Sequence, residues 1–312
     1  MATLKQLAEK EELFTGGHRL CAGCGIPQII RLILRSVGEN CSVVGTTATG
    51  CLEVGTSIYP YSSWRIPWIH SAFENASATM TGIEAAYNAL KRKGKIAKDK
   101  EIKFLAMGGD GGTYDIGFQA LSGALERGQD FVYLCYDNGA YMNTGIQRSS
   151  ATPFGSATTT SPAGSAIPGK TQWRKDLTRI VAAHNIPYAA QASAHNWKDL
   201  QRKAERAFAV KGPAFLNVVS PCPLGWYSKP ELSMETAKLA VETCYWPIYE
   251  IDEGVLKVNY KPKEKKPIEE WLKLQGRFKH LFKEENKGLL KEFQDRIDLE
   301  WARLLDLDGK HI

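Results

Sequence analysis

The 312-residue sequence lacks several features that mark large classes of protein. It has no run of the roughly 18–20 consecutive apolar residues that a membrane-spanning helix needs. Its first stretch, MATLKQLAEKEELF, has neither the apolar core nor the small-residue cleavage site of a signal peptide. This stretch predicts a short amphipathic helix instead. We therefore expect a cytoplasmic protein that is not attached to a membrane.

Basic residues are not concentrated in any one segment. The net charge is +6, from 40 Lys and Arg against 34 Asp and Glu, and the excess is dispersed with some enrichment toward the C-terminus. No basic helix with interleaved aromatic residues and no known nucleic-acid module is present. A modest, dispersed excess of positive charge is typical of a solvated surface. We therefore expect no nucleic-acid partner.

Apolar runs alternate with helical patterns through the middle of the chain. The predicted strands are residues 41–46, 102–109, 131–138, 188–193 and 214–220, and the predicted helices between them are residues 75–92, 113–127, 175–185 and 196–210. Several runs are apolar almost throughout, as expected of strands that are buried on both faces of a parallel sheet. The alternation predicts an α/β fold with a doubly wound, mostly parallel sheet. In such sheets, ligands bind beyond the carboxyl ends of the strands.

The pattern divides the chain into three parts. Residues 1–40 predict an N-terminal helix and a CxxC segment, residues 41–230 the α/β domain, and residues 231–312 a C-terminal extension. Within the domain, residues 139–172 form a loop rich in Gly, Ser, Thr and Pro without periodicity. A loop of that length in a compact domain is usually functional or disordered.

The C-terminal extension has its own local patterns. Residues 249–258 predict a small hairpin, and residues 267–282 and 287–305 predict two amphipathic helices with apolar residues at spacings of three and four. These helices are expected to pack either on a partner subunit or on the chain's own domain.

Glycines surround an aspartate at the end of the predicted strand 102–109, in the sequence GGDGGTYDIG. Glycines at a strand-to-helix turn let the backbone approach an anion, and the following helix start supplies free N–H groups. Asp110 would repel a phosphate unless Mg²⁺ lay between them, since Mg²⁺ binds carboxylate and phosphate oxygens together. Asn138, at the end of the neighbouring strand, would supply a second oxygen, and backbone carbonyls of its turn a third. A GDG turn at one strand end and an asparagine at the next strand end together form the signature of thiamine-diphosphate enzymes. We expect Asp110 to lie in a surface-facing turn.

Four of the seven cysteines occupy predicted loops. Cys21 and Cys24 form a CxxC motif ahead of a helical segment, Cys51 follows the first core strand, and Cys222 follows the last. These four positions could meet at one edge of the sheet. Ligand chemistry alone leaves three alternatives open, namely a [4Fe–4S] cluster, a structural zinc ion, and a redox-active or inert CxxC pair. The other three cysteines occupy strand or helix positions and are expected to be inert: Cys41, Cys135 and Cys244.

At these residues the chain resembles the beta subunit of the pyruvate:ferredoxin oxidoreductases, within a 2-oxoacid:ferredoxin oxidoreductase family that has oxalate oxidoreductase as a close relative. The matching stretches run in the family's order: GGHRLCAGCG, ATGCLEV, PWIHSAFENA, GGDGGTYDIG, YDNGAYMNTGIQRSSATP and PCPLGW. The resemblance implies oxidative decarboxylation of a 2-oxoacid, pyruvate first, to acyl-CoA and CO₂, with electrons passed to ferredoxin. The alternative substrates are oxalate or another 2-oxoacid. A non-catalytic metal-binding module with the same fold is the alternative from a different class.

The same resemblance implies a role for each motif residue. One [4Fe–4S] cluster would be bound by Cys21, Cys24, Cys51 and Cys222. Mg²⁺ would be held against the diphosphate by Asp110, Asn138 and the backbone carbonyl of Ala140. The cofactor would contact Cys51 and two turns: Gly109, Asp110, Gly111, Gly112, Asn138, Gly139, Ala140, Tyr141, Met142 and Asn143. Asn143 would be catalytic and would reach toward the thiazolium and the substrate.

The implied enzyme needs other subunits. Enzymes of this family activate the aminopyrimidine of the cofactor with a glutamate from a second, pyrimidine-binding domain, whereas this chain has one cofactor motif. The resemblance therefore implies an alpha subunit with that domain, a ferredoxin-like iron–sulfur subunit, external ferredoxin and coenzyme A, in a complex that dimerises. His70 lies in a segment near the diphosphate in relatives, although we expect a packed structural histidine. Ile26 stands where some relatives have glutamate, so this position assigns no substrate.

Overall fold

The computed structural model describes residues 3–38, 41–97, 99–164 and 166–312. The strands are β1 (Ser42–Ala48), β2 (Trp68–Ser71), β3 (Ile102–Gly109), β4 (Val132–Asp137), β5 (Tyr188–Ser193), β6 (Ala214–Val219), β7 (Tyr249–Asp252) and β8 (Val255–Val258). The α-helices are α1 (Leu4–Glu9), α2 (Ile26–Arg35), α3 (Cys51–Thr56), α4 (Ala76–Arg92), α5 (Phe118–Glu126), α6 (Leu177–Ala182), α7 (Trp197–Ala209), α8 (Pro223–Trp226), α9 (Ser233–Glu242), α10 (Ile268–Lys273) and α11 (Lys287–Asp306). The predicted N-terminal helix is present as α1, and residues 1–2 of that prediction lie outside the described residues.

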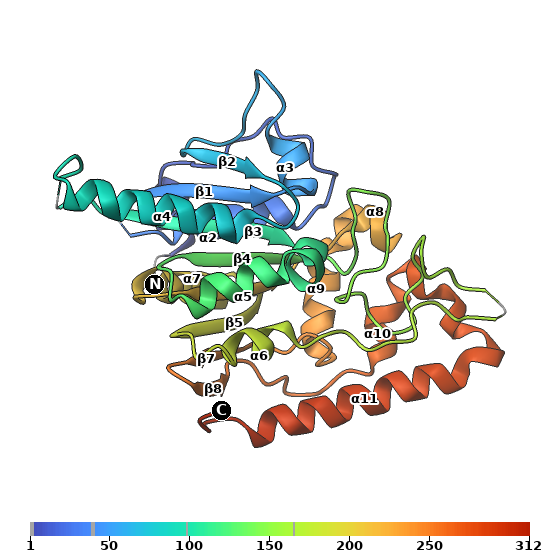
Figure 1. The fold of residues 1–312 in the computed structure, drawn as a ribbon. Helices are drawn as coiled ribbons and strands as arrows, with labels where there is room; N and C mark the ends of the chain where they lie inside the picture. The colour runs from blue at the N-terminus through green and yellow to red at the C-terminus, as the bar shows by residue number, and fades with distance from the viewer. Residues whose placement is uncertain (1–2, 39–40, 98, 165) are drawn as a thin grey trace.

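The strands form one eight-stranded sheet in the order β2-β1-β3-β4-β6-β5-β7-β8 (Figure 1). The six strands from β2 to β5 are parallel, and the β7–β8 hairpin joins β5 antiparallel. The predicted doubly wound, mostly parallel α/β fold is therefore confirmed, and so is the hairpin. Among the described residues, no helix combines the length and the apolar character that crossing a membrane requires.

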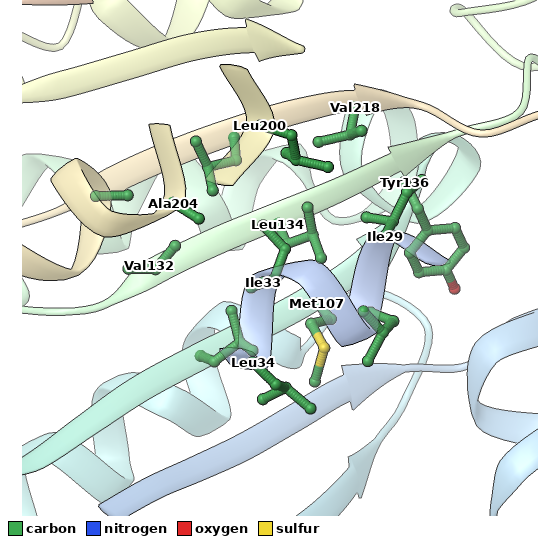
Figure 2. Close-up of a cluster of buried hydrophobic side chains, with 14 of the residues drawn as sticks. Ile29, Ile33, Leu34, Met107, Val132, Leu134, Tyr136, Leu200, Ala204 and Val218 are labelled. Atoms are coloured by element: carbon green, nitrogen blue, oxygen red, sulfur yellow. The ribbon is translucent and has the colours of Figure 1, made fainter. Parts of the chain in front are cut away.

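Helices with an apolar side cover both faces of the sheet. On one face, Ile29 and Ile33 of α2 pack with Leu134 of β4 and Leu200 of α7 (Figure 2). The spacing of apolar residues in IPQIIRLILR places the isoleucines on one side of α2. Helices α4, α5 and α6 contribute to a separate apolar cluster on the opposite face. Burial from both sides explains why β4, β5 and β6 are apolar almost throughout.

The C-terminal extension packs against this chain's own α/β domain. In the extension, Trp271 of α10 and Phe293 of α11 are buried, and so is Phe278 in the segment between the two helices. They form one cluster with Phe154 and Trp226 from the domain. The extension thus completes a core of its own chain. Its contact with a partner subunit stays a prediction.

The predicted amphipathic helix over residues 267–282 is wrong in its second half. Helix α10 ends at Lys273, Gln275 is extended with φ −128° and ψ 115°, and Gly276–Phe282 form a 3-10 helix. A Cβ atom on Gly276 would lie 2.8 Å from the Cβ of Tyr227, so the chain turns here in close contact with the end of α8. Apolar spacing within the segment cannot reveal this contact, because the contact comes from a distant part of the sequence.

Candidate active site at the carboxyl edge of the sheet

Four neighbouring strands bring the predicted site residues to one edge of the sheet. In the sheet order β1-β3-β4-β6, the chain continues from these strands into Cys51, Asp110, Asn138 and Cys222. Parallel strands end at the same edge, so these loops lie side by side. The start of α2 joins them, because the Gly25 N–H donates to the carbonyl of Pro221 at 3.0 Å.

A cavity opens between these loops. It is lined by Thr49, Gly50, Cys51, Phe73, Gly109, Asp110, Gly111, Gly112, Tyr136, Asn138, Ala140, Tyr141, Met142, Asn143 and Thr144. Of the predicted cofactor contacts, all but Gly139 line this cavity. Sequence reasoning missed Tyr136, which looks like an ordinary strand residue. Its hydroxyl reaches the cavity beside Gly50, where a Cβ atom would lie only 2.9 Å away.

Three groups converge on one side of the cavity. One atom of the Asn138 side-chain amide lies 2.9 Å from Asp110 Oδ1 and 3.0 Å from the carbonyl oxygen of Ala140. If this atom is the amide nitrogen, it donates hydrogen bonds to both oxygens. If it is the amide oxygen, it forms with them a set of three oxygens that could bind one cation. Neighbouring ligands of an octahedral Mg²⁺ with bonds of about 2.1 Å lie about 2.9 Å apart. The donor types and the two distances from Asn138 therefore fit Mg²⁺.

Asp110 is fully buried, which corrects the expectation of a surface-facing turn. Its Oδ1 accepts the Asn138 N–H at 3.2 Å, and its Oδ2 accepts the Ser149 hydroxyl at 2.5 Å. The loop that carries Ser149 covers the aspartate, and no local sequence signal reports that cover. Burial and the neighbouring Asp137 carboxylate raise the pKa of Asp110 well above its ordinary value. A buried carboxylate in this position needs a cation to stay charged.

The turn after Asp110 is a π-helical turn, Gly111–Ile116, so the helix predicted over 113–127 is this turn followed by α5. Such turns are frequent at functional sites. A Cβ atom on Gly111 would lie 2.5 Å from the ring of Tyr141, and one on Gly112 would lie 3.1 Å from the carbonyl of Phe73. These two glycines therefore allow the cavity walls to approach the turn closely.

The four predicted cluster ligands gather beside the cavity. Cys51 lines the cavity. Cys222 lies against Gly225, since a Cβ atom on this glycine would be 3.4 Å from the Sγ atom of Cys222. Burial raises the pKa of Cys24 to about 12, the Ile26 amide lowers it, and the thiols of Cys222, Cys51 and Cys21 raise it further. The CxxC segment adjoins the Cys222 loop through the bond from the Gly25 N–H to the Pro221 carbonyl. In the described ranges, no three His, Cys, Asp or Glu side chains are close enough together to enclose a single metal ion.

Other residues singled out in the sequence lie apart from the cavity. His70 is not a packed histidine, since its side chain is 44% exposed and faces Glu53 at 3.7 Å. Ile26 is buried at the start of α2. The remaining cysteines do not line the cavity: Cys41, Cys135 and Cys244.

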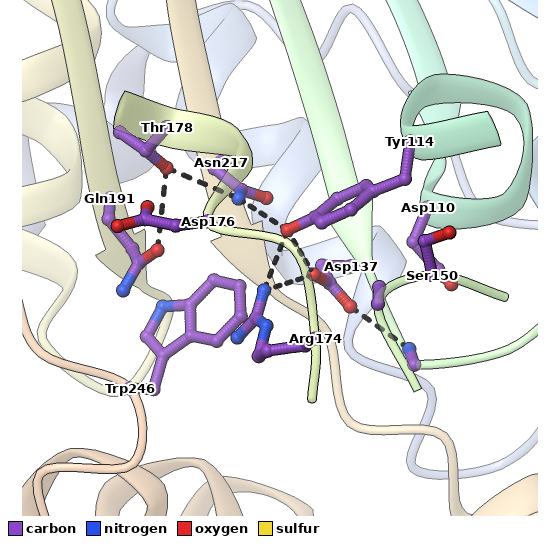
Figure 3. A network of polar contacts seen from close by, with 12 residues as sticks. Asp110, Tyr114, Asp137, Ser150, Arg174, Asp176, Thr178, Gln191, Asn217 and Trp246 are labelled. Atoms are coloured by element: carbon purple, nitrogen blue, oxygen red, sulfur yellow. Dashed lines mark hydrogen bonds and ion pairs between the residues drawn. The ribbon is translucent and has the colours of Figure 1, made fainter. Parts of the chain in front are cut away.

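A buried polar network fixes the loop behind the cavity (Figure 3). The carboxylate of Asp137, the last residue of β4, pairs with Arg174 at 2.8 Å and accepts the Tyr114 hydroxyl at 2.7 Å. Its other oxygen accepts the Gly139 N–H at 3.0 Å. The network therefore orients the turn that carries Asn138. Sequence reasoning missed these residues, although an aspartate at the end of an apolar strand was a usable signal.

Known proteins share this architecture. Residues 48–218 match the family described as thiamine pyrophosphate enzyme, C-terminal TPP binding domain. That range contains the cavity loops after β1, β3 and β4. The fold is also similar to that of a solved 2-oxoglutarate:ferredoxin oxidoreductase from Magnetococcus marinus, with a TM-score of 0.55 and 20% identity over 74% of this chain and 81% of that one.

Similarity to curated relatives extends over nearly the whole chain. It is 54% identical to the pyruvate synthase subunit PorB of Methanocaldococcus jannaschii, over 93% of this chain and 97% of the relative. It is 53% identical to the PorB subunit of Thermotoga maritima, over 98% of this chain and 96% of the relative. With the thiamine-binding domain at its centre, the chain belongs to the 2-oxoacid:ferredoxin oxidoreductase family, as a beta subunit of the pyruvate synthase type.

Proposed function

We propose that this chain binds thiamine diphosphate through Mg²⁺ next to one [4Fe–4S] cluster, and that its complex oxidises pyruvate to acyl-CoA and CO₂ with ferredoxin as electron acceptor. The observation that carries the proposal is the convergence of Asp110, Asn138 and Ala140 in a cavity within the thiamine-binding domain. Pyruvate as the substrate is supported by the names of the relatives.

The cavity residues would bind, orient and shield the cofactor. When bound, thiamine diphosphate supplies a carbon nucleophile and an electron sink for decarboxylation. Asp110, Asn138 and the Ala140 carbonyl would hold Mg²⁺ against the diphosphate. Tyr141 stacks on Phe73 with ring centroids 5.6 Å apart, and this aromatic pair would exclude water from the cavity. Asn143 lines the cavity and is exposed, so it is placed to meet the substrate.

The cluster would be bound by Cys21, Cys24, Cys51 and Cys222. Burial raises the pKa of Cys51 and that of Cys24 to about 12, so these two thiols would lose their protons only to a metal. A [4Fe–4S] cluster is bound by four cysteine thiolates, and two of these cysteines follow strands of the parallel part of the sheet, Cys51 after β1 and Cys222 after β6. Cys51 would belong to both sites, since it lines the cofactor cavity. The electron path between them would then be short.

Partner subunits would complete the enzyme. Among the residues that line the cavity there is no glutamate, so the group that activates the aminopyrimidine would come from an alpha subunit. A ferredoxin-like subunit would carry electrons from the cluster to external ferredoxin, and coenzyme A would take up the acyl group. We infer that this complex dimerises.

Asp110→Asn tests the cofactor site. The substitution keeps the shape but removes the charged ligand, and we expect the purified complex to bind thiamine diphosphate roughly 100-fold more weakly at fixed Mg²⁺, a loss of about 2.7 kcal/mol. Asn138→Ala should weaken binding less, because it removes a neutral ligand. The exposed Asp130→Asn serves as the matched control and should leave the affinity unchanged. Titration of the cofactor into each variant gives the affinities. A lower melting temperature with unchanged affinity for Asp110→Asn would show that the carboxylate only supports the turn.

A further inference from the structure

One cation in the C-terminal extension is buried without an acidic partner. Arg277 is 2% exposed. Its Nε and Nη2 donate to the amide oxygen of Gln275 at 3.0 and 2.7 Å, which is a neutral acceptor. Its guanidinium lies over the rings of Trp226 at 4.4 Å and Phe278 at 5.0 Å. In the part of the chain that the structure describes, no carboxylate forms an ion pair with it, unlike Arg174, which pairs with Asp137. A buried, uncompensated charge is costly and calls for an anion.

Arg277 lies behind both parts of the candidate site. Arg277 contacts the turn that carries Asn138, because a Cβ atom added to Gly139 would lie 3.1 Å from Arg277 Nη1. The ring of Trp226 beneath the guanidinium donates its Nε1–H to the carbonyl of Asn138 at 2.6 Å. The backbone N–H of Trp226 donates to the carbonyl of Cys222 at 2.8 Å. One stacked arginine therefore backs the loops of Asn138 and Cys222 together.

Several ionisable groups surround Arg277. Burial lowers the pKa of Arg277 to about 10, and the groups that raise it are Tyr245, Cys222, Asp137 and Asp110. Asp137 already has Arg174 as its partner. The positive charge of Arg277 is therefore not neutralised by Asp137, and it lies over Trp226, whose backbone N–H binds the carbonyl of Cys222.

We propose that Arg277 is the buried countercharge of the cluster held by Cys222, and that it sets the reduction potential of that cluster. This inference rests on the cluster of the proposed function. A cluster bound by four thiolates is anionic, and its reduction adds another negative charge. A nearby cation that is not neutralised by a carboxylate favours the reduced form, and the low dielectric of the interior preserves the effect. The extension would thus tune the electron-transfer site as well as complete the core.

A pair of variants separates charge from packing in the purified complex. Arg277→Met keeps an apolar chain against Trp226 but removes the charge, whereas Arg277→Lys keeps the charge and loses the planar stacking. We expect Arg277→Met to lower the equilibrium constant for cluster reduction roughly tenfold, a shift of about 59 mV to more negative potential for one electron. Arg277→Lys should shift it much less. Potentiometric titration followed by electron paramagnetic resonance measures the midpoint, and iron analysis checks cluster content. Arg296→Met is the control and should not shift the midpoint, because this half-exposed arginine of α11 already pairs with Glu300.

A third variant covers the case in which Arg277→Met does not fold. Gln275→Glu gives the guanidinium a carboxylate partner while keeping the arginine, at the loss of the 2.9 Å bond from Gln275 to the Trp271 carbonyl. It should also make the midpoint more negative. Full iron content with an unchanged midpoint in the charge-altering variants, or equal shifts for Arg277→Met and Arg277→Lys, would overturn the role of Arg277 alone. A wild-type complex without iron would overturn the cluster itself, and this role with it.

Discussion

At the scale of single residues, buried charges around the cofactor loops are held in different ways. Asp110 accepts two hydrogen bonds, and Asp137 has an arginine partner. Lys170 is 2% exposed and donates to the carbonyls of Thr152 at 2.6 Å and Ser150 at 3.2 Å. These bonds close the turn that brings the Ser149 hydroxyl to Asp110. Lys170 is thus a remote support of the candidate Mg²⁺ site.

The charge of Lys170 should appear in the pH dependence of stability. Burial lowers its pKa to about 7, whereas an unfolded chain has a lysine pKa of about 10.4. Between these values the unfolded state binds more protons, so this lysine makes the free energy of unfolding rise with pH. Urea unfolding of the wild-type chain and Lys170→Met from pH 7 to 10 measures the contribution. We expect the free energy of unfolding of the wild type to increase with pH, relative to that of the variant, by up to about 1.4 kcal/mol per pH unit. A difference that does not vary with pH would mean that Lys170 titrates normally.

At the scale of elements, sequence patterns predicted some structures and missed others. The five predicted strands are present because their continuous apolar runs report burial on both faces, whereas β2 was missed because it has four residues, and two of these are exposed. Asp110 and Asn138 were predicted to lie at the ends of neighbouring strands, and Cys51 and Cys222 to reach one edge of the sheet, because each follows a predicted strand. The π-helical turn and the break at Gln275 were missed, since close contacts with distant residues decide them.

The turn of the CxxC motif depends on Gly23. This residue has φ +72°, and a Cβ atom there would lie 2.5 Å from the carbonyl oxygen of Pro230. Gly23→Ala should therefore displace the turn and lower the iron content, at a cost of about 1–3 kcal/mol for the close contact. Gly17→Ala is the matched control, because Gly17 has φ +86° but open space around it. Iron per chain and the melting temperature measure both effects. Equal iron content in the two variants would show that the contact with Pro230 is unimportant.

At the scale of the whole molecule, the sequence could locate the site but not its supports. Ser149 and Arg174 reach the cofactor loops from segments without regular strand or helix patterns, and Arg277 from a segment in which the predicted α-helix is a 3-10 helix. Their roles arise from contacts between residues far apart in the chain, such as that of Ser149 with Asp110. The sequence of the C-terminal extension was equally compatible with packing on a partner subunit and with packing on its own α/β domain. The buried cluster around Trp271 shows that the extension packs on its own domain.

The isolated chain should be inactive even with its cofactors bound. The cavity lining described above contains no glutamate to activate the aminopyrimidine. We therefore expect no pyruvate-dependent reduction of a viologen dye by the partner-free chain supplied with thiamine diphosphate, Mg²⁺ and coenzyme A. The intact complex in the same assay is the positive control. Turnover by the chain alone would refute the division of the active site between subunits.

The measurement that tests the central claim most directly is the metal content of the chain and its cysteine variants. We predict about four iron atoms and four acid-labile sulfides per wild-type chain, and a large loss of both in Cys21→Ser, Cys24→Ser, Cys51→Ser and Cys222→Ser. Cys41→Ala and Cys135→Ala should keep full content, because neither cysteine lines the cavity. Stoichiometric zinc in the native protein, or full iron and sulfide in any of the four serine variants, would contradict a cluster at this edge of the sheet.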